Sequence, residues 1–112
     1  MSRKMDDHYR VILSPRAFAD LESILDYIRQ DSPQNAAKMV DRLWESAQSL
    51  GEFPRRHRVV ETRQRARRET RMMPDPPYLI YYQILEREKV VRILTVRHGA
   101  RRRHSDAPQG GQ

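Results

Sequence analysis

The sequence predicts one α+β domain of the order β-α-α-β-β-β, with a helical hairpin packed on one face of a small, mostly antiparallel sheet. Two helix-start signals stand close together in the first half of the chain, and a short apolar run precedes them. In the second half, two long apolar runs flank one short polar link. A chain of 112 residues can bury one modest core, which predicts a single domain.

The first strand and the first helix are predicted over residues 9–13 and 15–30. Residues 9–13, YRVIL, form a short apolar and β-branched run, which is typical of a strand. Ser14 and Pro15 then supply an N-cap and a first helical residue whose missing N–H has no intrahelical partner. Apolar residues recur at steps of three and four, which predicts an amphipathic helix: Phe18, Leu21, Ile24, Leu25 and Ile28.

A second helix is predicted directly after the first, because Ser32 and Pro33 repeat the start signal. Gly51 stands where a left-handed C-cap would end it, and Pro54 opposes continuation. The short link predicts an antiparallel hairpin, and Trp44 is expected to anchor it to the core. The expected apolar face contains Ala36, Val40, Leu43, Trp44, Ala47 and Leu50.

The second half of the chain is predicted to form strands. Residues 57–62 are expected to be extended, residues 67–73 are a weaker strand candidate, and residues 74–77, PDPP, are expected to be a rigid break. Residues 78–85 and 90–96, joined by a polar turn, predict a β-hairpin. Both of these runs are partly apolar on both faces, which predicts central positions in the sheet.

The predicted organisation is a flexible leader over 1–8, the domain over 9–100 and a basic, disordered tail over 101–112. No apolar run approaches the roughly 20 residues of a membrane span, and no secretory signal is recognisable. The absence of cysteine excludes disulfides and thiolate metal sites. The four histidines have no ligand spacing, so no metal or other cofactor is expected. The expected compartment is the cytoplasm.

The positive charge is concentrated in the second half. The net charge is +7, but residues 1–51 hold 7 Lys+Arg and 8 Asp+Glu, whereas residues 52–112 hold 15 and 7. Of the 22 basic residues 19 are arginines, whose planar donors suit carboxylates and phosphates. This distribution predicts a polyanionic partner, either a nucleic acid or an acidic protein.

Several segments together resemble the RelE/ParE toxins, in an order and spacing that extend from about Tyr9 to Arg103. They are VILSPRA at 11–17, DL at 20–21, ILDYI at 24–28, SP at 32–33, AA at 36–37, LGEFP at 50–54, PYLIYY at 77–82, VRIL at 91–94 and VRHGAR at 96–101. The resemblance implies the same fold and a toxin of a type II toxin–antitoxin pair.

The same resemblance implies the partners. A cognate antitoxin would wrap the toxin and neutralise it in a hetero-oligomer. One branch of the family cuts messenger RNA on the ribosome, whereas the ParE-like branch is associated with poisoning DNA gyrase. A different hypothesis is a non-toxic, basic nucleic-acid-binding protein on the same fold.

Cleavage of RNA without a metal requires a base, a cation on the phosphate and an acid. The candidates are Arg71, Arg97 and His98, with Tyr81 or Tyr82 as possible acids. Alternation along a strand would point Arg97 and His98 to opposite faces, which disfavours a shared role. Glu61 would be a possible base only if it lay near Arg71.

Family comparison also favours the ParE-like branch. RNA-cleaving members typically carry an arginine where this chain has Tyr78, and several of them have a tyrosine near the end, whereas none follows Tyr82 here. Arginines beside the expected sheet edge and in the tail are candidates for binding the target or the antitoxin: Arg63, Arg65, Arg67, Arg68, Arg101 and Arg102.

Overall fold

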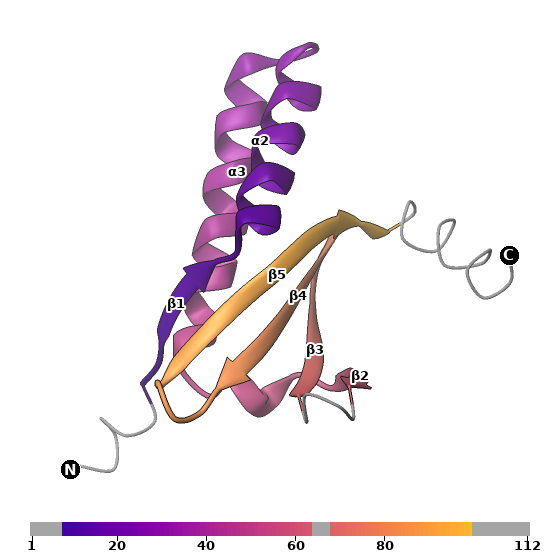
Figure 1. The fold of residues 1–112 in the computed structure, drawn as a ribbon. Helices are drawn as coiled ribbons and strands as arrows, with labels where there is room; N and C mark the ends of the chain where they lie inside the picture. The colour runs from indigo at the N-terminus through magenta and orange to yellow at the C-terminus, as the bar shows by residue number, and fades with distance from the viewer. Residues whose placement is uncertain (1–7, 64–67, 100–112) are drawn as a thin grey trace, which may run out of the picture.

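The computed structural model describes residues 8–63 and 68–99. Its order is β1 (Arg10–Leu13), α2 (Pro15–Arg29), α3 (Pro33–Gln48), the 3-10 turns η1 (Ser49–Gly51) and η2 (Pro54–Arg56), β2 (Val59–Arg63), β3 (Arg68–Asp75), β4 (Tyr78–Leu85) and β5 (Val90–His98). The helical hairpin packs on one side of the sheet and projects beyond it (Figure 1). The predicted fold class is confirmed.

The sheet has five strands in the order β1-β5-β4-β3-β2. β1 runs parallel to β5, and the other neighbouring pairs are antiparallel. The β4–β5 hairpin is central, as predicted. The segment expected to be extended over 57–62 forms β2, an additional edge strand.

The predicted break at residues 74–77 is shorter in the structure. β3 continues through Asp75, which pairs with Tyr78, so only Pro76 and Pro77 form the turn. β2 pairs with β3 only as far as Arg71, so the outer side of β3 is free at Pro74. A residue without an N–H is tolerated at such an edge, which explains why the strand continues.

The core lies between the hairpin and the sheet. Its largest fully buried side chains include Tyr82, Leu43 and Leu50. The prediction that Trp44 anchors the hairpin is wrong, because Trp44 is 37% exposed. Leu43 and Ala47 are four residues apart and share the buried face, whereas Trp44 is turned about 100° from Leu43 around the helix.

Two further expectations differ from the structure. Phe18 is 55% exposed, and its neighbour Ala17 occupies the buried position of α2. Gly51 does not have a left-handed conformation; among the described residues that region is occupied by Phe53 and Lys89. Gly51 is needed instead for space, because an added Cβ would lie 2.8 Å from the carbonyl oxygen of Tyr9.

The start of α2 extends the contact that β1 makes with β5. Ser14 caps α2 by accepting from the Ala17 N–H at 3.0 Å, and its hydroxyl donates to the Leu94 carbonyl at 2.8 Å. Asp20 then accepts from the Val96 N–H at 2.9 Å and from the Thr95 hydroxyl. Helix α2 and its cap therefore supply hydrogen-bond partners for the edge of β5 beyond the end of β1, which fixes the helical hairpin on the sheet.

His8, expected in the leader, forms an isolated bridge with Glu52. The tail expected over 101–112 and the rest of the leader lie outside the described residues. Within the part of the chain that is described, no helix is long and apolar enough to cross a membrane.

Candidate functional site

Arg71 lies on the helix-facing side of β3, where Met73 and the paired Tyr82 also point. Its Nη1 donates to the carbonyl oxygens of His57 at 2.7 Å and Arg55 at 3.4 Å. Its Nη2 lies 3.3 Å from Glu69, and the side chain is only 15% exposed. These contacts connect β3 to the chain between η2 and β2, so the guanidinium has a structural role.

Tyr82 and His57 pack beside this arginine, with their rings in a T-shaped arrangement 6.4 Å apart. The Tyr82 hydroxyl donates to the Pro54 carbonyl at 2.5 Å. Burial raises the pKa of Tyr82 to about 12, although Arg71 and Arg56 oppose the shift. A buried phenol with this pKa and this bond is a poor proton donor for catalysis at neutral pH.

His57 carries the unpartnered polar atom of this region. Its Nε2 is buried and has no hydrogen-bond partner within the described structure. Burial lowers the pKa of His57, and the charge of Arg56 lowers it further. The ring is therefore neutral in the folded state at pH 7.

Arg97 and His98 point to opposite faces of β5, as predicted. The Arg97 guanidinium lies over the Tyr81 ring, 5.8 Å from its centroid. The His98 ring packs edge-on against buried Tyr78, with centroids 5.3 Å apart. Tyr78 belongs to the core, so His98 is on the helix-facing side and Arg97 is on the other side.

The three candidate catalytic residues do not meet at one site. Arg97 is separated from Arg71 and His98 by the sheet. Arg71 pairs with Tyr82 and His98 with Tyr78, and these tyrosines are four residues apart along β4, or about 13 Å. Glu61 pairs with Thr70, one position from Arg71 and so on the opposite face. Its suggested role as a base beside Arg71 is not supported.

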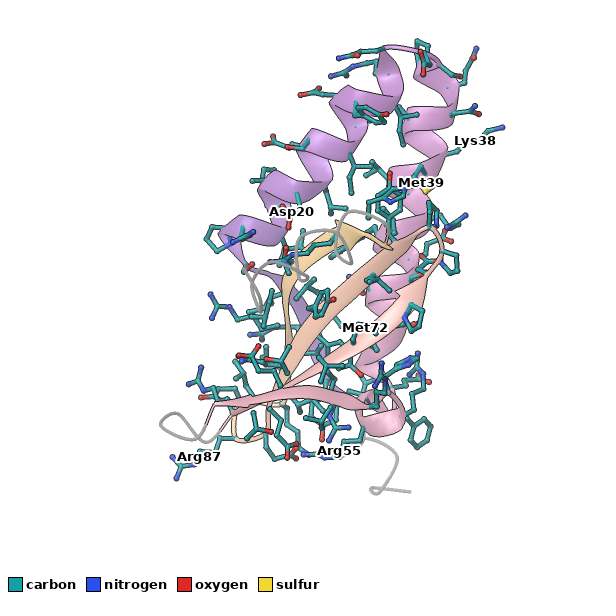
Figure 2. All side chains as sticks on the ribbon, turned by 90° about the vertical axis from the view of Figure 1, so that its right-hand side faces the viewer. Asp20, Lys38, Met39, Arg55, Met72 and Arg87 are labelled. Atoms are coloured by element: carbon teal, nitrogen blue, oxygen red, sulfur yellow. The ribbon has the colours of Figure 1, made fainter. Side chains whose placement is uncertain are left out.

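The side of the sheet away from the helices is called the open face here. It is defined by alternation with the core residues of each strand, and it carries Arg10, Ile12, Glu61, Arg68, Thr70, Met72, Leu79, Tyr81, Gln83, Arg92 and Arg97. Met72 and Thr70 are its buried centre, and Gln83 donates to the Thr70 hydroxyl at 3.3 Å. Figure 2 labels Met72 on the sheet.

The candidate binding arginines are only partly described. Arg68 begins β3 and is exposed, while Arg63 ends β2 opposite it. Arg65, Arg67, Arg101 and Arg102 lie outside the described residues. The structure therefore places Arg68 on the open face together with Arg92 and Arg97. The sequence analysis proposed Arg97 as a catalytic candidate, whereas Arg92 was not a candidate for any role.

A polar cluster at the end of the sheet farthest from the hairpin tip was not anticipated. Glu86 accepts from the Tyr9 hydroxyl at 2.9 Å, and Arg55 and Lys89 each lie 3.0 Å from its carboxylate. These hydrogen bonds, led by that of Lys89, lower the pKa of Glu86 to about 2. The parallel pairing of β1 with β5 brings Tyr9 to this turn, and Figure 2 shows Arg55 and Arg87 at this end. Local sequence patterns contain no signal for such pairing.

Large aromatic side chains on and beside the helical hairpin are exposed, and of these Phe18 was expected in the core. Phe18 and Tyr27 are 55% and 68% exposed, and Phe53 beside η2 is 65% exposed. Phe18 and Tyr27 are nine residues apart, which places them on opposite sides of α2. Among the described residues no group of three potential metal ligands occurs.

Comparison with known proteins identifies the family. Residues 11–103 match the family of the ParE toxin of the type II toxin–antitoxin system parDE. The chain belongs to the ParE toxin family. The predicted resemblance to RelE/ParE toxins is thereby confirmed.

Two relatives of this ParE-family chain are named as toxins. Toxin RelE2 of Caulobacter vibrioides is 39% identical over 92 residues, which cover 82% of this chain and 97% of that protein. Putative toxin Y4kP of Sinorhizobium fredii is 36% identical over 112 residues, covering 97% and 98% of the two chains. A type II toxin is therefore established at the level of the family.

Solved structures support the ParE-type fold. A chain of the chromosomal ParDE system from P. aeruginosa superposes with a TM-score of 0.67 at 21% identity, over 82% of this chain and 97% of that one. A chain of the toxin–antitoxin complex RelBE2 from Mycobacterium tuberculosis gives 0.54 at 25% identity, over 81% and 98%.

Proposed function

We propose that this type II toxin inhibits growth in the cytoplasm by poisoning DNA gyrase and that a cognate antitoxin neutralises it. The observation that supports gyrase over messenger RNA is the separation of Arg71, Arg97 and His98. A nuclease needs its acid, base and phosphate cation around one bond. In the described part of this chain, Arg71 is engaged with carbonyl oxygens and His98 packs on Tyr78.

The test is induced expression of the full chain in a bacterial host. The expected result is growth arrest with double-strand breaks that are trapped by denaturant and lost in a host whose gyrase is resistant. Messenger RNA mapped by primer extension should remain uncut. Codon-phased cleavage of messenger RNA with intact DNA would instead establish the RelE-like alternative, and arrest-free binding of nucleic acid would support the non-toxic hypothesis.

A substitution at His98 separates the two toxin mechanisms. His98→Gln preserves the size and polarity of the side chain but cannot act as a general acid. Growth arrest should survive this change, because no proton transfer is required of His98. Loss of arrest together with loss of messenger cleavage would overturn the gyrase proposal. Circular dichroism of the purified variant checks that packing on Tyr78 is retained.

We further propose that the antitoxin covers the exposed aromatic side chains of the hairpin. Phe18 and Tyr27 lie on opposite sides of α2, so a partner that buries both must wrap the helix. Both side chains are aromatic, and aromatic residues are enriched in protein–protein interfaces. Co-expression with the antitoxin should raise the yield of soluble chain. Tyr27→Ser and Phe18→Ser should each weaken the complex, whereas Glu22→Ser, an exposed residue of the same helix, should not.

A further inference from the structure

Two groups of described arginines differ in both position and contacts. The first group, near the helices and turns, binds acids or carbonyl oxygens: Arg29 to Asp26, Arg42 to Asp75, Arg55 to Glu86, Arg71 to Glu69, and Arg56 to the carbonyls of Ser49, Glu52 and Phe53. The open-face arginines, Arg10, Arg68, Arg92 and Arg97, form no ion pair or hydrogen bond between side chains of the described residues. Arg16, Arg58 and Arg87 also form no side-chain ion pair or hydrogen bond among the described residues but lie outside the open face.

The open face is also distinct in charge. Of the acidic residues in the described strands, Glu69 and Asp75 alternate with the core-facing Met73, so they lie on the helix-facing side. Glu61 is the acid that remains on the open face, opposite Thr70. Four arginines against one glutamate, on a face that no described helix covers, make a surface suited to a polyanion.

The spacing of these arginines fits one strand of a nucleic acid. A bulge in β5 places Arg92 and Arg97 on the same face, and their partners on β4, Gln83 and Leu79, are four residues apart, which corresponds to about 13 Å. Phosphates on one strand of a duplex follow one another about every 3.4 Å along the helix axis, so this distance spans about four nucleotides. Arg10 and Arg68 lie on strands three sheet positions apart, or about 14 Å, and widen the surface on both sides.

We infer that the open face binds the sugar-phosphate backbone of DNA through Arg92 and Arg97, with Arg10 and Arg68 as flanking contacts. The choice of DNA rests on the proposed function, because the DNA bound by gyrase is the polyanion at the target. Tyr81 holds the Arg97 guanidinium by a cation–π contact, so the planar donors are presented with little loss of freedom. Backbone contacts of this kind carry no sequence information.

The experiment measures binding of the purified full chain to a fluorescent duplex DNA, by anisotropy, over a range of salt concentrations. The double variant Arg92→Ala/Arg97→Ala should bind at least about tenfold more weakly, and its log–log salt slope should be smaller by about 2. The matched control is Arg29→Ala/Arg42→Ala on the hairpin, which removes the same charge and should change the affinity less than threefold. The charge-conserving double variant Arg92→Lys/Arg97→Lys should retain most of the binding.

Several results would overturn the inference. These are equal losses in the open-face and hairpin variants, absence of DNA binding by the wild-type chain, or tenfold tighter binding of RNA of the same sequence. Gyrase poisoning is scored separately on the same proteins. Unchanged DNA binding by the open-face double variant refutes the inference but leaves the proposed function intact if poisoning persists. Arginine-dependent DNA binding without any poisoning refutes the proposed function and retains the binding surface.

Discussion

The hydroxyl of Tyr82 on β4 donates a hydrogen bond to the carbonyl oxygen of Pro54 on η2, at a distance of 2.5 Å. The phenol is fully buried, and its ring contacts the edge of His57. Arg71 binds the carbonyl of His57 from the neighbouring strand. Through these contacts the central strands hold the segment that leads into β2, so the residues that suggested chemistry in the sequence stabilise the fold.

Tyr82→Phe should lower the free energy of unfolding by about 1 to 2 kcal/mol, because it leaves the buried Pro54 carbonyl without its donor. The measurement is urea unfolding at pH 7. The matched control is Tyr81→Phe, since the Tyr81 hydroxyl on the open face has no hydrogen bond in the described structure, and a change within about 0.5 kcal/mol is expected there. Equal losses in both variants would contradict the assigned role.

The neutral, buried His57 should make stability depend on pH. Its pKa is lowered in the folded state by burial first and by Arg56 second. The Tyr82 ring packs edge-on against the imidazole, and Arg71 binds the backbone carbonyl of His57. A lowered histidine pKa means that stability is complete above the unfolded pKa of about 6.5 and falls as the pH decreases toward the folded value. Urea midpoints at pH 7.5 and 5.5 measure the decrease. His57→Phe should reduce it, whereas His8→Gln, at an exposed histidine, should not.

Glu86 should control a second, more acidic transition. Its pKa is lowered to about 2, mainly by hydrogen bonds from Lys89 and Tyr9. A lowered carboxylate pKa stabilises the fold above the unfolded value of 4.5, and this stabilisation is lost as the pH falls from 4.5 toward 2. Glu86→Gln should reduce the change of the free energy of unfolding with pH in that range. Because the side chain is half exposed, the effect should shrink in high salt, and Glu88→Gln in the same turn is the control.

Gly51→Ala should destabilise the fold through backbone crowding. The new Cβ would lie 2.8 Å from the Tyr9 carbonyl oxygen, and the Tyr9 N–H is bound to the Gly51 carbonyl at 2.7 Å, so neither segment can move freely. A loss of about 1 to 3 kcal/mol is expected from thermal or urea unfolding. At Gly99 the nearest atom is 3.3 Å away, and Gly99→Ala should cost less. The reverse order would show that Gly51 tolerates the side chain.

Asp20→Ala should loosen the hairpin from β5. The change removes the acceptor of the Val96 N–H and of the Thr95 hydroxyl, and a loss of about 2 kcal/mol is expected. Amide hydrogen exchange at Val96 should accelerate more than exchange at Ile93, which lies in the pairing with β1. Glu22→Ala, at an exposed position of the same helix, serves as the control. Unchanged protection at Val96 would contradict the edge-satisfying role of Asp20.

Much of the fold followed from local patterns in the sequence. The caps at Ser14 and Ser32 start α2 and α3 as predicted, with hydrogen bonds from Ala17 and Asn35 to the two serine hydroxyls. The apolar runs at 78–85 and 90–96 form the central hairpin, because their side chains are apolar on both faces. The alternation that set Arg97 and His98 apart also held, because a strand has a period of two.

Burial of individual side chains was decided by tertiary structure. The periodicity marked Phe18 and Trp44 as core residues, yet the hairpin projects beyond the sheet and its packing is completed by small residues such as Ala17, Ala36 and Ala47. Helical spacing gives the direction of a side chain, but not whether a neighbouring element is present to cover it. The exposed aromatic residues are therefore a result of the tertiary arrangement.

The sequence by itself determined the elements, their order, the family and the concentration of positive charge after residue 51, because these depend on local spacing and on composition. Only the tertiary structure decided which arginines are free to bind. Contacts between segments distant in sequence give Arg42 and Arg55 their acids, whereas Arg71 meets Glu69 on its own strand. Strand pairing leaves Arg92 and Arg97 on a face where Glu61 is the acid among the described strand residues. The charge of a residue is local, but its neutralisation depends on partners that the fold brings to it.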